Sequence, residues 1–137
     1  MARVWLLMGA VLLVAACGSD EAPPVEPGVD VEAVVGDMAA TLDDMIDVLA
    51  HVKSESDIET LKPRLRDIAA RLKVGRETFD RMSSDEQGRF RRAIDLSGRR
   101  QRSRDARKRV PKPLMVKLEA AMAEAMRSVG GDPALFR

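Results

Sequence analysis

The chain of 137 residues is long enough for one small domain, and its 3% aromatic content leaves few rings to stack on nucleic-acid bases. With one cysteine and one histidine, it can form neither an internal disulfide bond nor a cluster of histidine ligands. The formal net charge is +1, yet residues 20–60 carry twelve acids and one base, whereas residues 61–137 carry 21 bases and ten acids. The two parts therefore have opposite net charges of −11 and +11.

The first 16 residues are typical of a secretory signal peptide. Arg3 supplies the positive start, residues 4–14 form an apolar stretch, and Ala15 and Ala16 are the small residues expected before a cleavage site. A membrane-spanning helix needs about 20 apolar residues, and this stretch ends too early for that. We therefore expect residues 1–16 to be removed on export.

The only cysteine, Cys17, follows this segment directly. Residues 13–17, with the sequence LVAAC, resemble the lipobox of bacterial lipoproteins. The resemblance implies that the Cys17 thiol receives diacylglycerol, that cleavage occurs before it and that the new amine is acylated. Because Gly18 follows in place of aspartate, it also implies the outer membrane, on the side that faces the periplasm. Two alternatives stay open: a secreted protein with an incidental cysteine, and an uncleaved membrane anchor.

Lipidation of Cys17 would leave the mature chain without a thiol, which excludes disulfide, thiolate and cysteine–metal chemistry. Residues 17–29 then form a flexible, proline-rich tether. Proline-rich segments stay extended at about 3.1 Å per residue, so the tether can hold a domain up to roughly 40 Å from a bilayer. The domain itself is predicted to span residues 30–137.

Two long helices are predicted by apolar residues that recur every three or four positions. The first spans residues 30–52 and has Asp30 as its N-terminal cap. Its apolar stripe consists of Val35, Met38, Leu42, Met45, Leu49 and Val52. The second runs to about Met82 from a capping box of Ser56 and Glu59. Its stripe consists of Ile58, Leu61, Leu65, Ile68, Leu72, Gly75, Phe79 and Met82.

Matching stripes and a short connection predict that these two helices form an antiparallel hairpin. Gly75 lies on the stripe of the second helix, where we expect a notch for a large side chain or a neighbouring helix. A functional opening beside Gly75 is the alternative. The stripes can also be buried by dimerisation of the hairpin.

Shorter helices follow the hairpin. Ser83 and Glu86 form a capping box that opens a third helix. Its short apolar face consists of Phe90, Ala93, Ile94 and Leu96. A last helix spans about residues 114–129 and ends before Gly130, which suits a left-handed cap. The fold class is therefore all-α, a hairpin extended to a small bundle of three or four helices.

Residues 41–73 resemble a family of small exported bacterial helical proteins, in which a serine-capped turn joins two helices and a proline stands early in the second. Residues 122–127, with the sequence MAEAMR, resemble the late helix of that family. The resemblance supports the hairpin and implies no activity.

The most basic segment of the chain is Arg99–Arg109. It holds seven bases, one acid and a single apolar residue, Ala106, so we expect it to lie outside the core as a helix in water or a flexible connector. The candidate binding residues are Arg99, Arg100, Arg102, Arg104, Arg107, Lys108 and Arg109. One interpretation is that they neutralise the acidic first helix. The other is an anionic partner, such as lipid head groups, an acidic protein or an anionic polymer, because arginine suits phosphate and carboxylate. The exported address argues against nucleic acid.

Other chemistry has weaker support. Asp44, Asp47 and His51 lie on one helix face and could contribute to a metal site, although one helix rarely supplies enough ligands. Four methionines on the stripes, Met38, Met45, Met82 and Met122, are interpreted as core-filling side chains rather than copper ligands. We see no paired catalytic carboxylates and no activated nucleophile. The sequence thus predicts a non-enzymatic envelope lipoprotein without a cofactor or metal, and the alternative is a periplasmic carrier of a ligand or metal.

Overall fold

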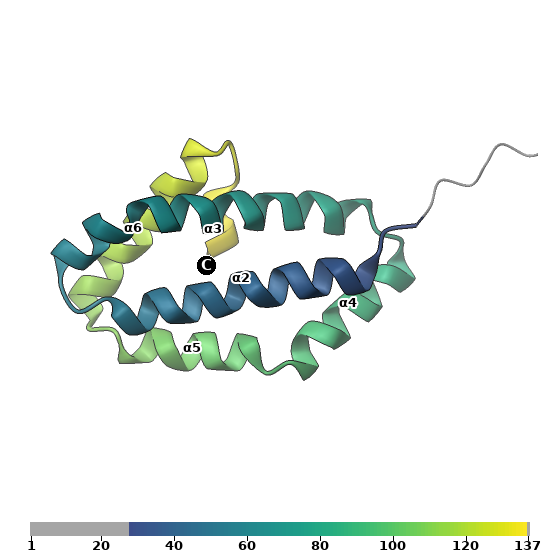
Figure 1. Ribbon diagram of the computed structural model, residues 1–137, viewed down its shortest axis with the longest axis horizontal. Coiled ribbons are helices and arrows are strands. Elements are labelled where there is room, and N and C mark those ends of the chain that lie inside the picture. The colour runs from purple at the N-terminus through teal and green to yellow at the C-terminus, as the bar shows by residue number, and fades with distance from the viewer. Residues whose placement is uncertain (1–27, 137) are drawn as a thin grey trace, which may run out of the picture.

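The structure, a computed structural model, describes residues 28–136 (Figure 1). The elements of this part are α2 (Val31–His51), α3 (Glu55–Arg81), α4 (Ser84–Leu96), α5 (Arg99–Arg109), α6 (Lys112–Ser128) and the short 3-10 helix η1 (Pro133–Phe136). The predicted all-α fold is confirmed, since the described residues contain no strand. The predicted signal peptide, Cys17 and residues 17–27 of the tether lie outside the described residues. Within residues 28–136, no helix has the length and apolar character needed to cross a bilayer.

The predicted antiparallel hairpin is confirmed, and it forms the centre of the bundle. Helices α2 and α3 run side by side in opposite directions, and α6 packs against α3 (Figure 1). Helices α4 and α5 pack one after the other along α2. Helix α2 therefore contacts α3, α4 and α5. The second half of its apolar stripe, Met45, Leu49 and Val52, is buried within one chain, whereas Val35, Met38 and Leu42 in the first half are half-buried.

The start of α2 agrees with the sequence, whereas the start of α3 does not. The carboxylate of Asp30 accepts a hydrogen bond from the Ala33 amide over 3.1 Å, as expected of the cap. Helix α3 begins two residues earlier than predicted, because its cap is Ser54 rather than Ser56. The side chain of Asp57 accepts hydrogen bonds from the amides of residues 53 and 54, over 2.8 and 2.9 Å. Two overlapping Ser-x-x-acid patterns compete here, and the one closer to the end of α2 forms the box.

Helix α6 also begins two residues earlier than predicted, at Lys112, whereas the predicted cap of α4 and the predicted end of α6 hold. Ser83 caps α4, and Glu86 reaches back to the Ser83 amide over 2.8 Å, so the second capping box is confirmed. Gly130 has a φ of 73°, and its amide donates to the Arg127 carbonyl over 3.1 Å. The next amide, of Gly131, donates to the Met126 carbonyl over 2.9 Å. These two bonds form a Schellman motif, which satisfies the last carbonyls of α6 and turns the chain back toward the bundle.

Two hydrophobic clusters hold the helices together. The larger one is built mainly by α2, α3 and α6, and its fully buried members include Val48, Leu65, Ile68, Leu118 and Met126. The smaller one lies where the start of α2, the end of α3 and α4 meet, and its buried members are Val31, Met82, Phe90 and Ile94. Within the part of the chain that the structure describes, the members of both clusters fall between positions 29 and 135.

The prediction that Arg99–Arg109 stays outside the core is wrong. The segment is helix α5, and it packs along α2 through Ala106, which is 8% exposed, with Val110 buried just after the helix. Both residues belong to the larger cluster. A single alanine is enough because a small side chain lets two helices approach closely, and the long arginine stems can extend past the contact while their charged ends stay in water.

Candidate anion-binding site

The candidate site is the outer face of α5. Gly98 precedes the helix with a φ of 68°, a left-handed conformation that lets the chain turn between α4 and α5. The contact with α2 fixes the rotation of α5, because Ala106 must face inward. Since α5 has seven bases and one acid, its net charge is +6, and this charge lies around the sides and the outer face of the helix.

Three of the basic residues reach acids of α2 and α6. Arg99 donates from Nε to Oδ1 of Asp43 on α2 over 2.9 Å, and Arg102 lies 4.0 Å from the same oxygen. Arg107 lies 3.5 Å from Glu119 of α6. Intramolecular neutralisation, one of the two interpretations of the sequence, therefore occurs only in part, because a single acid of α2 pairs with α5.

The remaining ion pairs of α5 are short-range and lie at the surface. Arg100 pairs with Asp95 at the end of α4 over 3.2 Å, and Lys108 lies 3.8 Å from Asp105 within α5 itself. The Lys108 side chain is 77% exposed. Exposed pairs of this kind contribute only about 0–1 kcal/mol each, so both cations stay accessible to another anion.

Two arginines and one leucine complete this surface. Arg104 and Arg109 are exposed and form no ion pair with any described residue. Leu96 was expected on the apolar face of α4, but it is 88% exposed. It ends α4 just before the turn at Gly98, where α4 no longer covers a neighbour. We name Leu96 together with Arg102, Lys108 and Arg109 the basic face, whereas Arg104 lies on the other side of α5.

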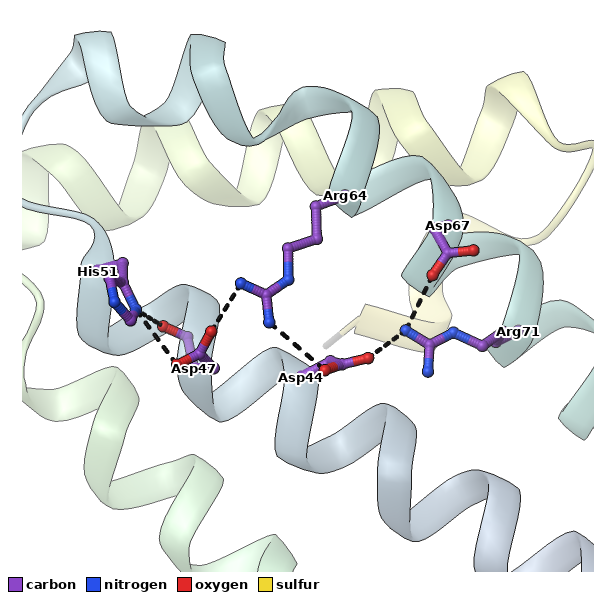
Figure 2. A network of polar contacts seen from close by, with 6 residues as sticks. All are labelled: Asp44, Asp47, His51, Arg64, Asp67 and Arg71. Atoms are coloured by element: carbon purple, nitrogen blue, oxygen red, sulfur yellow. Dashed lines mark hydrogen bonds and ion pairs between the residues drawn. The ribbon is translucent and has the colours of Figure 1, made fainter.

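The other acids of α2 are directed toward α3. Figure 2 shows Asp44 and Asp47 facing arginines of α3. Arg64 lies 2.6 Å from Asp47 and 3.4 Å from Asp44, and Arg71 donates a hydrogen bond to Asp44. Arg71 also pairs with Asp67 of its own helix over 3.0 Å. These five residues form a continuous network between α2 and α3, which leaves Asp44 and Asp47 unavailable to the basic face.

The network changes the acidity of its central carboxylate. The hydrogen bond from Arg71 lowers the pKa of Asp44 below its ordinary value of 3.8, and the charges of Arg71 and Arg64 act in the same direction. Partial burial opposes this effect without reversing it. Asp44 is therefore ionised throughout the neutral and mildly acidic range.

The same contacts engage Asp44 and Asp47, which together with His51 are the residues that a metal carrier would use. Its two carboxylates are bound by guanidinium groups, and His51 Nδ1 lies 2.8 Å from the Asp47 carbonyl and 3.3 Å from the Asp47 carboxylate. No group of three potential ligands that could hold a metal ion occurs among the described residues. The stripe methionines pack in or against the two hydrophobic clusters, as predicted.

Sequence reasoning identified the basic residues but missed their surroundings. It did not find Arg64 and Arg71 as partners of Asp44 and Asp47, although a signal was present. The two arginines are seven residues apart on one face of α3, opposite two acids on one face of an antiparallel helix. It also missed the exposure of Leu96, which depends on where the chain turns.

Comparison with protein families, with curated proteins and with solved structures gives no match. The resemblances to lipoproteins and to exported helical proteins remain predictions, and the function has to be argued from the residues of the chain.

Proposed function

We propose that this chain is a non-enzymatic lipoprotein of the bacterial cell envelope, anchored through Cys17, whose basic face binds the head groups of an anionic lipid surface. The observation that carries the proposal is the surplus charge of α5. Its net charge is +6, and one acid of α2, Asp43, is within reach of it, because Asp44 and Asp47 are bound by α3.

Physical chemistry favours a lipid surface over other anionic partners. A basic residue near an anionic bilayer contributes about 1 kcal/mol of binding free energy, and the guanidinium group fits phosphate oxygens. Leu96 adds an exposed apolar side chain just before the start of α5, which can enter the boundary between head groups and acyl chains. An acidic protein surface or a polysaccharide offers no such apolar layer.

The binding part of the proposal is tested by co-sedimentation of residues 18–137 with neutral and anionic phospholipid vesicles, at low and high salt. The wild-type chain should bind only the anionic vesicles, and high salt should release it. The double variant Arg102→Glu/Arg109→Glu should bind at least roughly 30-fold more weakly, because even neutralising two bases removes about 2 kcal/mol. Leu96→Ser should cause a smaller loss of vesicle binding. This loss should not depend on the salt concentration, because Leu96 is uncharged.

The matched control is Arg66→Glu/Arg127→Glu, which makes the same change in net charge at exposed positions of α3 and α6. It should keep most of the binding, and thermal unfolding should show that all variants are folded. Equal losses of vesicle binding in both double variants would show that net charge alone, and not the basic face, causes the effect. Absence of wild-type binding to anionic vesicles would overturn the lipid surface as the partner and direct the search to an acidic protein.

The anchor is tested separately by Cys17→Ser in the full chain, expressed in a bacterium with two membranes. The wild-type protein should fractionate with the outer membrane, and the mass of its N-terminal peptide should correspond to acylated Cys17. The variant should lose the lipid and leave the membrane fraction. A wild-type N-terminal peptide that begins elsewhere or lacks acyl chains would refute the lipoprotein assignment.

A further inference from the structure

A groove runs between α2 and α3, and it is formed by two adjoining cavities of about 380 and 340 Å³. The two share the lining residues Leu42, Leu72, Arg100 and Leu135, so they are continuous with each other. Leu135 belongs to η1, the last element of the chain, which lies near α2 and α3 (Figure 1). Each volume alone is within the range of about 300–1,000 Å³ that is usual for small-molecule sites.

The inner wall of the groove is apolar and narrow. Helix α2 contributes Met38, Leu42 and Met45, and α3 contributes Leu72, Gly75 and Phe79. Seven residues separate the ends of each set, which corresponds to roughly 10 Å along a helix. The expected notch at Gly75 is real, since a Cβ at that position would lie 2.8 Å from the Met38 methyl group. The wall therefore suits a slender, flexible apolar ligand rather than a broad ring system.

Every charged residue that lines these two cavities is an arginine, and no acid of the described chain lines either of them. On α5, Arg100, Arg104 and Arg107 are four and three residues apart, so they share one face of the helix. Arg104 is the member of this set without an ion pair among the described residues, and Ser103 beside it adds a hydroxyl group to the lining. At the far end, Arg91 lies over the Phe79 ring at 5.2 Å. The groove thus combines an apolar wall with an anion-binding end.

We infer that this groove binds a free medium-chain fatty acid. Its acyl chain lies along the α2–α3 wall, and its carboxylate accepts hydrogen bonds from the Arg104 guanidinium and the Ser103 hydroxyl. The arginines in the lining favour an anionic ligand. The narrow apolar wall of limited length favours a single acyl chain of moderate length. This site differs from the basic face in what it recognises, because it takes a single molecule between helices rather than a surface of head groups, and it does not depend on the proposed function.

The test is calorimetric titration of residues 18–137 with decanoate below its micelle concentration, and with decanol as the uncharged analogue. Decanoate should bind with a stoichiometry of one, and decanol should bind at least about tenfold more weakly, because a charge-assisted hydrogen bond is lost. Methyl NMR shifts of Leu42 and Leu72 should follow the same titration. Failure of decanoate to bind, or shifts confined to residues outside the two cavities, would overturn the inference.

Two substitutions on one helix separate the groove from the basic face. Arg104→Glu should weaken decanoate binding at least about tenfold, whereas Arg109→Glu, which lines neither cavity, should change it by less than about twofold. Leu135→Glu places an acid within the groove near the chain end and should abolish decanoate binding while the fold persists, as judged by thermal unfolding. Equal losses for Arg104→Glu and Arg109→Glu would show that only net charge matters and refute the site. Decanoate binding should survive Arg102→Glu/Arg109→Glu, the variant expected to weaken vesicle binding, because neither residue lines the two cavities.

Discussion

Helix α2 has two neighbours of opposite character, α3 and α5. Toward α3 it contributes apolar side chains to the larger cluster and the carboxylates of Asp44 and Asp47 to a network with two arginines. Toward α5 it meets one buried alanine and offers one carboxylate, that of Asp43. The acids of α2 are thus used mainly on the side that already holds the core. What this difference teaches is that an acidic helix can lie beside a basic one and still leave most of the basic charge available to a partner.

The largest expected effect compares the cores of the two interfaces. Leu65 of α3 is completely buried, and Leu65→Ala should lower the free energy of unfolding by about 2–5 kcal/mol because it leaves a cavity. Val110→Ala, at the end of α5, removes two methyl groups and should cost about 1.5 kcal/mol. Urea unfolding followed by circular dichroism measures both. Equal costs would mean that α5 is as much part of the core as α3.

The next effect concerns the ion-pair network on the α3 side. Asp44→Asn removes the carboxylate that Arg64 and Arg71 share and should destabilise the fold by about 1 kcal/mol, a value limited by the partial exposure of these side chains. A double-mutant cycle with Arg71→Gln should give a coupling energy of the same sign. A coupling of zero would show that the network contributes geometry without stability.

The pH dependence of this contribution follows from the lowered pKa of Asp44. A carboxylate whose pKa is lower in the folded state binds protons more readily in the unfolded state. Its stabilisation is therefore complete above its ordinary value of 3.8 and is lost as the pH falls through the lowered value. The stability difference between wild type and Asp44→Asn should stay constant from pH 7 to about pH 5 and vanish in strong acid. A difference that disappears already near neutral pH would contradict the assignment.

The smallest effect is expected at the single ion pair across the α5 interface. Asp43→Asn should destabilise the fold by no more than about 0.5 kcal/mol, since Arg99 and Arg102 remain partly in water. It should strengthen binding to anionic vesicles, because it frees two arginines and removes a negative charge. Weaker vesicle binding by Asp43→Asn would show that the ion pair positions the basic face rather than competing with it.

The sequence predicts well what depends on local patterns. The cap at Asp30, the box of Ser83 and Glu86 and the turn at Gly130 each need only a few adjacent residues, and the stripes of α2 and α3 predict their hairpin. The start of α3 was missed by two residues because two serines offer almost the same pattern. What depends on the rotation of one helix against another could not be read in this way. The pairing of Asp44 with Arg71 and the burial of Ala106 both belong to this second kind.

The basic residues of the candidate site were all identifiable from the sequence, whereas the different surroundings of each residue were not. Arg99, Arg104 and Arg109 are chemically identical, but the structure gives the first an acid of α2, places the second beside the groove and leaves the third at the surface. That assignment follows from the inward position of Ala106, a residue with no chemistry of its own.

The weak attachment of α5 affects the dynamics of this helix as well as its position. Because α5 buries only one residue within the helix, its separation from α2 exposes little apolar surface, and this opening should need less free energy than unfolding of the α2–α3 hairpin. Backbone amides of α5 should therefore exchange with deuterium when α5 alone separates from α2, while those around Leu65 exchange only on global unfolding. Each such separation moves Arg100, Arg104 and Arg107 away from the groove, so a carboxylate bound there should lose its arginine partners while α5 is detached.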